Sequence, residues 1–104
     1  MYEITLDYDD IDYKEVWDDV LARYEEERGV VRGFEIYESS PRHFHVRLHV
    51  TVASLSEQME IAWRTECSKE YLERVKDIGY WTIRTTAKSD GTPSPRLKVM
   101  LTEG

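Results

Sequence analysis

The chain has 104 residues, of which 40% are hydrophobic and 34% are charged, and its formal net charge at pH 7 is −7. A chain of this length usually forms one core, so we expect a single domain over residues 1–104. Seven tyrosines, three tryptophans and two phenylalanines supply enough large apolar surface to argue against disorder. The only cysteine is Cys67, which excludes an internal disulfide and a zinc site built from several cysteines.

The chain lacks the features of a membrane or secreted protein. No apolar run approaches the ~20 residues that a membrane-spanning helix needs, and no positively charged start precedes an apolar segment. A lone cysteine fits a reducing compartment. We therefore expect a cytoplasmic protein, in the interior of a host cell, with no membrane partner.

The negative charge is concentrated in the first quarter of the chain. Residues 1–27 hold eleven Asp or Glu against two Lys or Arg, a net charge of −9, whereas residues 28–104 hold ten against twelve, a net charge of +2. Phosphate binding depends on where cations cluster, so a mildly basic face can coexist with an acidic helix. The charge therefore leaves a nucleic-acid partner open. The simpler alternative is that the acids only keep the first helix soluble.

The first two predicted elements are a strand and a helix. Apolar and polar residues alternate over residues 2–8, which predicts a half-buried strand. Asp12 precedes Glu15 by three residues, which is the spacing of a capping pair, and apolar residues then recur at helical spacing. We expect a helix over residues 13–28.

The next two elements read as a hairpin. Residues 34–37 alternate in polarity, residues 39–41 carry turn chemistry, and residues 43–52 alternate again. The apolar residues of the second strand all point one way and should face the core. Its polar residues point the other way: His43, His45, Arg47, His49 and Thr51.

The following segment is helical. Ser54 and Glu57 form a capping box, and the helical pattern then continues until Gly79. An unbroken helix of this length would reach roughly 36 Å, which is too long for a domain with a radius of gyration of ~13 Å. We therefore expect a break near residues 66–68.

The C-terminal part predicts two more strands. Residues 81–86 read as one strand, residues 89–95 as a turn and residues 97–101 as the last strand. The resulting order is β-α-β-β-α-β-β, which predicts an α+β fold with a ferredoxin-like antiparallel sheet and helices packed on it. Such a fold hosts many unrelated activities, so function must come from a site.

The histidine strand carries a candidate metal site. His43 and His45 are two residues apart on a strand, so their imidazoles share one face at a spacing of ~7 Å. Glu35 on the preceding strand points to the same face, and a carboxylate with two imidazoles suits Mg²⁺ or Mn²⁺. His49 is a fourth ligand or a proton carrier. The ordinary alternative is a row of surface histidines without a metal.

Residues 34–50 resemble the second motif of HUH-type rolling-circle replication initiators, the Rep endonucleases of plasmids and small viruses. That motif pairs two histidines around a bulky apolar residue, here His43-Phe44-His45, and some members carry a glutamate eight residues earlier, where this chain has Glu35. The resemblance covers these 17 residues and the strand order around them. It implies that Glu35, His43 and His45 hold Mn²⁺ or Mg²⁺.

The resemblance also implies an activity. Such enzymes nick and join single-stranded DNA, commonly at a hairpin origin, through a helix-borne tyrosine that forms a 5′-phosphotyrosine link and frees a 3′-OH. The matching tyrosine here is Tyr71, with Lys76 as the assisting cation. The family usually places that lysine three or four residues after the tyrosine, whereas this chain has Arg74 at +3 and Lys76 at +5. A homodimer would supply two tyrosines.

Other assignments remain open. Tyr80 is a second candidate nucleophile, and Tyr71 could simply pack in the core. The run Glu66-Cys-Ser-Lys-Glu also resembles a Tyr-Cys-Ser-Lys-Glu motif of circovirus-like initiators, and in that alignment the nucleophile is missing. The alternative functions are a non-catalytic ferredoxin-like module that binds nucleic acid or protein, and a metal-dependent hydrolase without a covalent step.

Overall fold

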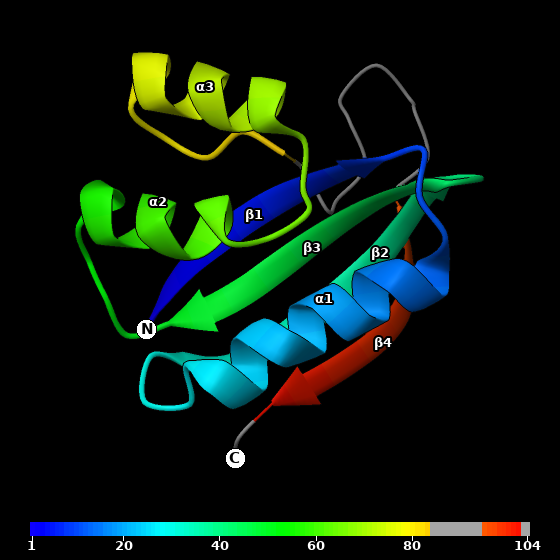
Figure 1. The fold of residues 1–104 in the computed structure, drawn as a ribbon, viewed down its shortest axis with the longest axis horizontal. Coiled ribbons are helices and arrows are strands. Elements are labelled where there is room, and N and C mark those ends of the chain that lie inside the picture. Colours follow the sequence, from blue (N-terminus) through cyan, green and yellow to red (C-terminus); the bar gives the residue numbers. More distant parts are fainter. Residues whose placement is uncertain (84–94, 103–104) are drawn as a thin grey trace.

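The computed structural model describes residues 1–83 and 95–102 and contains an antiparallel sheet covered by helices (Figure 1). This arrangement confirms the predicted α+β, ferredoxin-like fold. The elements follow the order β1 (Tyr2–Asp9), α1 (Tyr13–Glu26), β2 (Val31–Ser40), β3 (His43–Val50), α2 (Leu55–Trp63), α3 (Lys69–Ile78) and β4 (Arg96–Thr102).

The histidine strand β3 lies inside the sheet. The strand order is β1-β3-β2-β4, and every neighbouring pair is antiparallel. On one side of β3, Asp7 of β1 pairs with His45; on the other side, Tyr37 of β2 pairs with the same histidine. The polar side chains of β3 therefore lie between those of β1 and those of β2.

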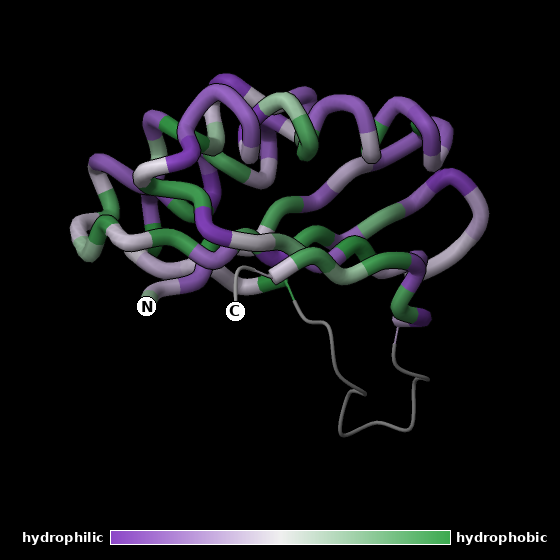
Figure 2. Tube along the Cα trace, turned by 90° about the horizontal axis from the view of Figure 1, so that it is seen from below, coloured by the Kyte–Doolittle hydropathy of each residue, from purple (hydrophilic) through white to green (hydrophobic). Residues whose placement is uncertain are grey.

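The core lies between the sheet and the helices. Figure 2 shows the helices as one layer above the sheet. Alternate residues of β3 point into this layer and are at most 2% exposed: Phe44, Val46, Leu48 and Val50. The alternation that predicts the strand thus also separates its core face from its polar face.

Local signals place the helix ends in the second half of the chain. The backbone N–H of Glu57 donates to Ser54 Oγ at 3.2 Å, which confirms Ser54 as the N-cap, while the Glu57 carboxylate accepts from the Ser54 hydroxyl at 3.1 Å instead of from its backbone N–H. Gly79 ends α3 with a φ of 89°, in the left-handed region that glycine enters without strain. The predicted break between α2 and α3 is confirmed. Among the described residues, none of the helices has the length and apolarity to cross a membrane.

The predicted capping pair at the start of α1 is wrong. Asp12 occupies the N-cap position, but its side chain makes no capping hydrogen bond. Arg42, in the turn between β2 and β3, donates from Nη1 to Asp12 at 2.5 Å and from Nε to Asp10 at 2.9 Å. The Asp12 carboxylate therefore pairs with the Arg42 side chain and not with a backbone N–H of α1.

The C-terminal predictions have mixed outcomes. The last strand is confirmed as β4. Residues 81–83 do not form a strand; the backbone N–H groups of Thr82 and Ile83 instead donate to the Tyr71 hydroxyl, at 3.2 and 3.4 Å. The remainder of the predicted strand 81–86 and nearly all of the predicted turn lie outside the described residues.

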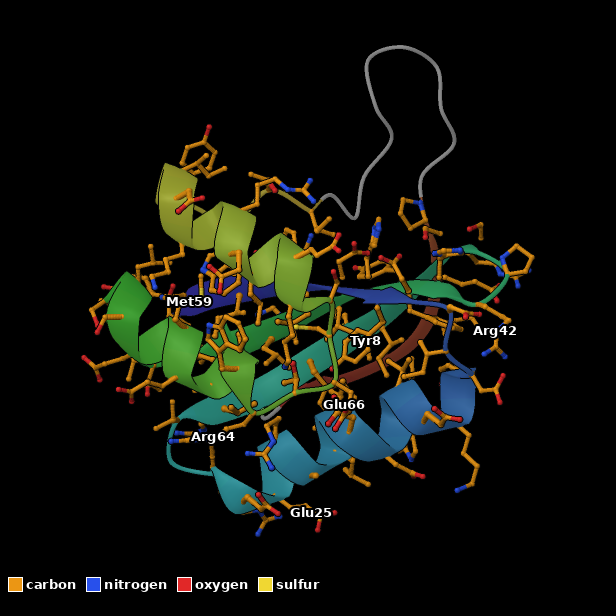
Figure 3. The ribbon with its side chains drawn as sticks, turned by 45° about the horizontal axis from the view of Figure 1, so that its top comes forward. Tyr8, Glu25, Arg42, Met59, Arg64 and Glu66 are labelled. Carbon is orange, nitrogen blue, oxygen red and sulfur yellow. The ribbon has the colours of Figure 1, made fainter. Side chains whose placement is uncertain are left out.

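A half-buried carboxylate, that of Asp19 on α1, joins Tyr8 and Glu66, which are labelled in Figure 3. Tyr8 of β1 donates its hydroxyl proton to Asp19 Oδ2 of α1 at 2.6 Å, and the backbone N–H of Glu66 donates to the same oxygen at 2.8 Å. Burial, and then the charge of Asp19, raise the pKa of the Tyr8 hydroxyl well above its ordinary value, so it remains a neutral donor. Asp19 thereby ties the turn between α2 and α3 to the sheet.

This arrangement predicts that Asp19→Ala lowers the free energy of unfolding by about 2 kcal/mol, because it leaves the buried Tyr8 hydroxyl without its acceptor. The matched control is Asp18→Ala, whose carboxylate is exposed and bonded only to Lys14 one turn earlier. That change should stay within about 0.5 kcal/mol. Urea denaturation measures both values, and equal losses would contradict the proposed role of Asp19.

Candidate functional site

The candidate site is the face of the sheet opposite the helices, which we call the polar face. The alternation of β1, β2 and β3 sends acids and bases to this side in adjacent rows. Bases of β3 therefore lie between acids of the two neighbouring strands. The rows are Glu3, Thr5, Asp7 and Asp9 on β1, His43, His45, Arg47 and His49 on β3, and Glu35 and Tyr37 on β2.

At one end of the polar face, two histidines meet two aspartates. His43 Nδ1 lies 2.9 Å from Asp9 Oδ1, and His45 Nε2 lies 3.7 Å from Asp7 Oδ1. Both contacts follow from the register, in which Asp9 is opposite His43 and Asp7 is opposite His45. We call these four side chains the His–Asp cluster.

The His–Asp cluster contains a carboxylate in an unfavourable environment. Burial raises the pKa of the Asp7 carboxyl above its ordinary value of 3.8, and the nearby charge of Asp9 raises it further. The charges of His45, His43 and Arg74 offset these effects only in part. A partly buried acid next to a second acid gains from any cation that binds between them, which is typical of functional sites.

Glu35 has other partners than the sequence predicts. Its carboxylate is 7% exposed, and its Oε2 lies 2.7 Å from His49 Nε2. The Tyr37 hydroxyl donates to Oε1, and Arg47 Nη1 lies 3.6 Å from the same oxygen. Burial alone would raise the pKa of Glu35, but the hydrogen bonds from Tyr37 and His49 and the charge of Arg47 outweigh it and lower the pKa. Glu35 is a satisfied anion.

The strand register puts Glu35 between His45 and His49 on the polar face. Glu35 is opposite Arg47 in the β2–β3 ladder, whereas His45 is opposite Tyr37. The diagonal neighbours of Glu35 on β3 are therefore His45 and His49, and its carboxylate bonds to His49. A spacing of eight residues between a glutamate and a histidine does not by itself set this register.

The polar face has the donor types that a hard divalent cation uses. Within residues 1–83 and 95–102, no three side chains of His, Cys, Asp or Glu converge as ligands of one ion. The His–Asp cluster nevertheless combines two imidazoles and two carboxylates on adjacent strands, a donor set that suits Mn²⁺ or Mg²⁺. The sequence-predicted set has the same donor types, but its carboxylate, Glu35, is bonded to His49.

Tyr71 reaches the polar face from the edge of the sheet. Helix α3 lies along β1 (Figure 1), and the Tyr71 hydroxyl is 3.0 Å from Thr5 Oγ1. Thr5 is opposite Arg47 and one same-face position from Asp7, a step of about 7 Å along the strand. Tyr71 itself is 1% exposed.

Arg74 and Lys76 lie on different sides of α3. Three residues after Tyr71, Arg74 shares its side of α3, and its charge lowers the pKa of Asp7. Lys76, five residues after Tyr71, lines a groove between α2 and α3. Tyr80 follows the end of α3 and is 63% exposed.

Glu66 of the circovirus-like alignment lies in the turn between α2 and α3. Its backbone N–H donates to Asp19, and its side chain is exposed. The alternative alignment would thus put a nucleophile in this turn, whereas Tyr71 lies on α3 with its hydroxyl beside Thr5.

Sequence reasoning missed the β1 residues of the site. Thr5, Asp7 and Asp9 belong to the strand whose alternation is plain in the sequence, but nothing in that pattern says that β1 lies next to the histidine strand. Comparisons of the chain with models of protein families, with curated proteins and with solved structures gave no match. Function is therefore inferred from the chain's own residues and from the geometry of the polar face.

The two shifted carboxyls predict opposite effects on stability. Glu35 has a lowered pKa, so its contribution is present above 4.5 and is lost as the pH falls through the lower folded value. Asp7 has a raised pKa, so its ionisation costs stability as the pH rises from 3.8 through the higher folded value.

We therefore expect Glu35→Gln to destabilise the protein at pH 7, with a deficit that shrinks below pH 4.5. Asp7→Asn should match or exceed the wild-type stability at pH 7, with a gain that disappears below pH 3.8. Thermal or urea unfolding across pH 3 to pH 8 measures both differences, with that pH range set by the ordinary carboxyl pKa values of ~4. A destabilised Asp7→Asn at neutral pH would contradict this account.

Proposed function

We propose that the protein is a metal-dependent enzyme that nicks and joins single-stranded DNA, as a replication initiator does. Tyr71 is the nucleophile, and His43, His45 and a nearby carboxylate hold Mn²⁺ or Mg²⁺. This function combines the resemblance of residues 34–50 to the HUH motif with the chemistry of the polar face. It also accounts for acids and histidines held side by side on an antiparallel sheet.

The observation that supports the proposal most directly is the position of the Tyr71 hydroxyl. It bonds to Thr5, on the same side of the sheet as His45 and Asp7. The ring of Tyr71 packs in the core, and its hydroxyl ends beside Thr5, which is one same-face position from Asp7 on β1.

The proposed reaction exchanges one phosphate ester for another. The phenolic oxygen of Tyr71 bonds to phosphorus while the bond between phosphorus and the 3′ oxygen breaks. The products are a 5′-phosphotyrosine link and a free 3′-OH, and the proton lost by the phenol ends on the 3′ oxygen. The reverse exchange with a second 3′-OH joins the strands.

Two arginines are placed to stabilise the phosphate charge. Arg47 is opposite Thr5, the residue to which the Tyr71 hydroxyl is bonded, and Arg74 acts on Asp7. Cations near a scissile phosphate favour the charge that develops as the bond breaks. These residues take the role that the sequence assigns to Lys76.

The sequence and the structure select different carboxylates as the ligand that completes the metal site. The family spacing selects Glu35, but the carboxylates that face the two histidines are Asp7 and Asp9. We assign the role to Asp7, because its unfavourable ionisation is relieved by a cation. When bound, the ion supplies Lewis-acid stabilisation of the phosphate oxygens.

A second candidate is a non-catalytic module that binds nucleic acid or protein. One observation favours it: Tyr71 is 1% exposed, and its hydroxyl accepts hydrogen bonds from the backbone of Thr82 and Ile83. A buried hydroxyl that accepts these bonds can have a purely structural role, which is to hold residues 82 and 83 against α3. Under the first proposal, Thr82 and Ile83 must move aside before a phosphate can reach the oxygen.

The nicking proposal predicts a covalent protein–DNA adduct. Incubation with Mn²⁺ and labelled single-stranded hairpin oligonucleotides of varied sequence should give a band that resists denaturing electrophoresis. Tyr71→Phe should abolish the band, and His43→Ala or His45→Ala should reduce its rate by about 100-fold or more. Tyr80→Phe, which changes an exposed tyrosine beyond α3, is the matched control and should have no effect. An adduct that persists in Tyr71→Phe, or none with any hairpin, refutes the proposal.

If Asp7 and not Glu35 holds the ion, substitution of Asp7 should reduce the affinity for Mn²⁺ more than substitution of Glu35. Asp7→Asn should weaken Mn²⁺ binding by about 10- to 100-fold, measured by calorimetry and by paramagnetic broadening of the His43 and His45 NMR signals. Glu35→Gln should weaken it less. Glu38→Gln is the control, since that carboxylate binds Arg96 at 2.7 Å. A larger loss in Glu35→Gln would restore the sequence-based ligand set, and no affinity at millimolar Mn²⁺ would favour the binding module.

A further inference from the structure

A second surface, away from the polar face, has the features of a protein interface. Helices α2 and α3 enclose an open groove of about 690 Å³ whose lining includes Leu55, Met59 and Trp63. These residues are four apart and form one stripe along α2. Met59 is 8% exposed and forms the floor, whereas Trp63 is 40% exposed and stands at one end.

Large apolar side chains remain exposed on this helix pair. Trp63 of α2, Ile78 of α3 and Tyr80 just beyond α3 are 40%, 44% and 63% exposed. Exposed apolar residues that gather on one element pair, and are flanked by charges, mark interaction surfaces more often than single ones do. The acidic outer side of α1 has no such stripe.

Trp63 is held in position before any partner arrives. Lys69 Nζ lies 5.3 Å from the centre of the indole ring and donates to the Trp63 carbonyl oxygen at 3.2 Å. A fixed aromatic side chain loses little conformational entropy when it becomes buried, so it is suited to anchor an interface.

The two banks of the groove carry opposite charges. Glu60 lies on the α2 bank and also lines a smaller depression with Glu27 and Val30, toward α1, so it is on the side away from α3. Lys76 lies on the α3 bank. Arg64, at the end of the α2 bank, is already paired with Glu27, which leaves Glu60 and Lys76 as the charges available to a partner.

We propose that this groove is the interface of a homodimer, with a second copy of the chain as its occupant. A two-fold axis that runs along the groove places the α2 bank of one copy opposite the α3 bank of the other. Glu60 of each copy then faces Lys76 of the other, and the two Trp63 side chains cover the apolar floors. The surface is self-complementary in charge and in polarity, which an isologous dimer requires. The inference does not depend on the proposed nicking activity.

The test is the oligomeric state of charge variants, measured by sedimentation equilibrium on the full chain. The wild type should form dimers, and Glu60→Lys or Lys76→Glu alone should each weaken association by about tenfold, because like charges then face each other. The double variant Glu60→Lys with Lys76→Glu should recover the wild-type affinity. Trp63→Ala should give monomers, with circular dichroism to verify its fold.

Glu25→Lys is the matched control, because Glu25 is an exposed acid on α1 that does not line the groove (Figure 3). It makes the same change in net charge as Glu60→Lys and should leave association unchanged. A wild type that remains monomeric at about millimolar concentration, a scale that marks weak binding, overturns the proposal. A dimer that is indifferent to the groove variants, or a double variant that fails to recover, overturns it as well.

Discussion

The site depends on the pairing of β3 with a strand on each side. Two antiparallel ladders fix the register of this strand, so each polar side chain that it sends away from the core has a defined neighbour. His43 and His45 face aspartates of β1, and His49 binds Glu35 of β2. Charges that are partly buried persist only when they are paired, and the central position of β3 supplies those pairs.

The polar face divides into two regions that differ in how well their charges are satisfied. Glu35 accepts hydrogen bonds from Tyr37 and His49 and has a lowered pKa, as expected of a carboxylate that stabilises the sheet. Asp7 has a raised pKa beside Asp9. Ionisation of Asp7 is therefore less favourable than ionisation of Glu35, and perturbed carboxyls of this kind are often found at functional sites.

Local signals in the sequence predict most of the fold. Alternation predicts the strands, the Ser54 N-cap and Gly79 mark helix ends, and the length limit on one helix predicts the break between α2 and α3. These features depend on residues that are neighbours along the chain. The prediction for Asp12 is wrong because its partner, Arg42, comes from a turn thirty residues away, which no local pattern encodes.

The alternation along residues 43–50 is enough to show that His43 and His45 share one face of a strand and that this face is polar, because a strand has a period of two residues. Which carboxylates meet them depends on the folded chain: strand order puts Asp7 and Asp9 beside the histidines, and Glu35 bonds to His49. The same holds for Tyr71, whose helical position is readable but whose approach to Thr5 depends on where α3 lies along β1. Periodicity acts within an element, whereas strand order, register and helix placement depend on packing across the whole chain.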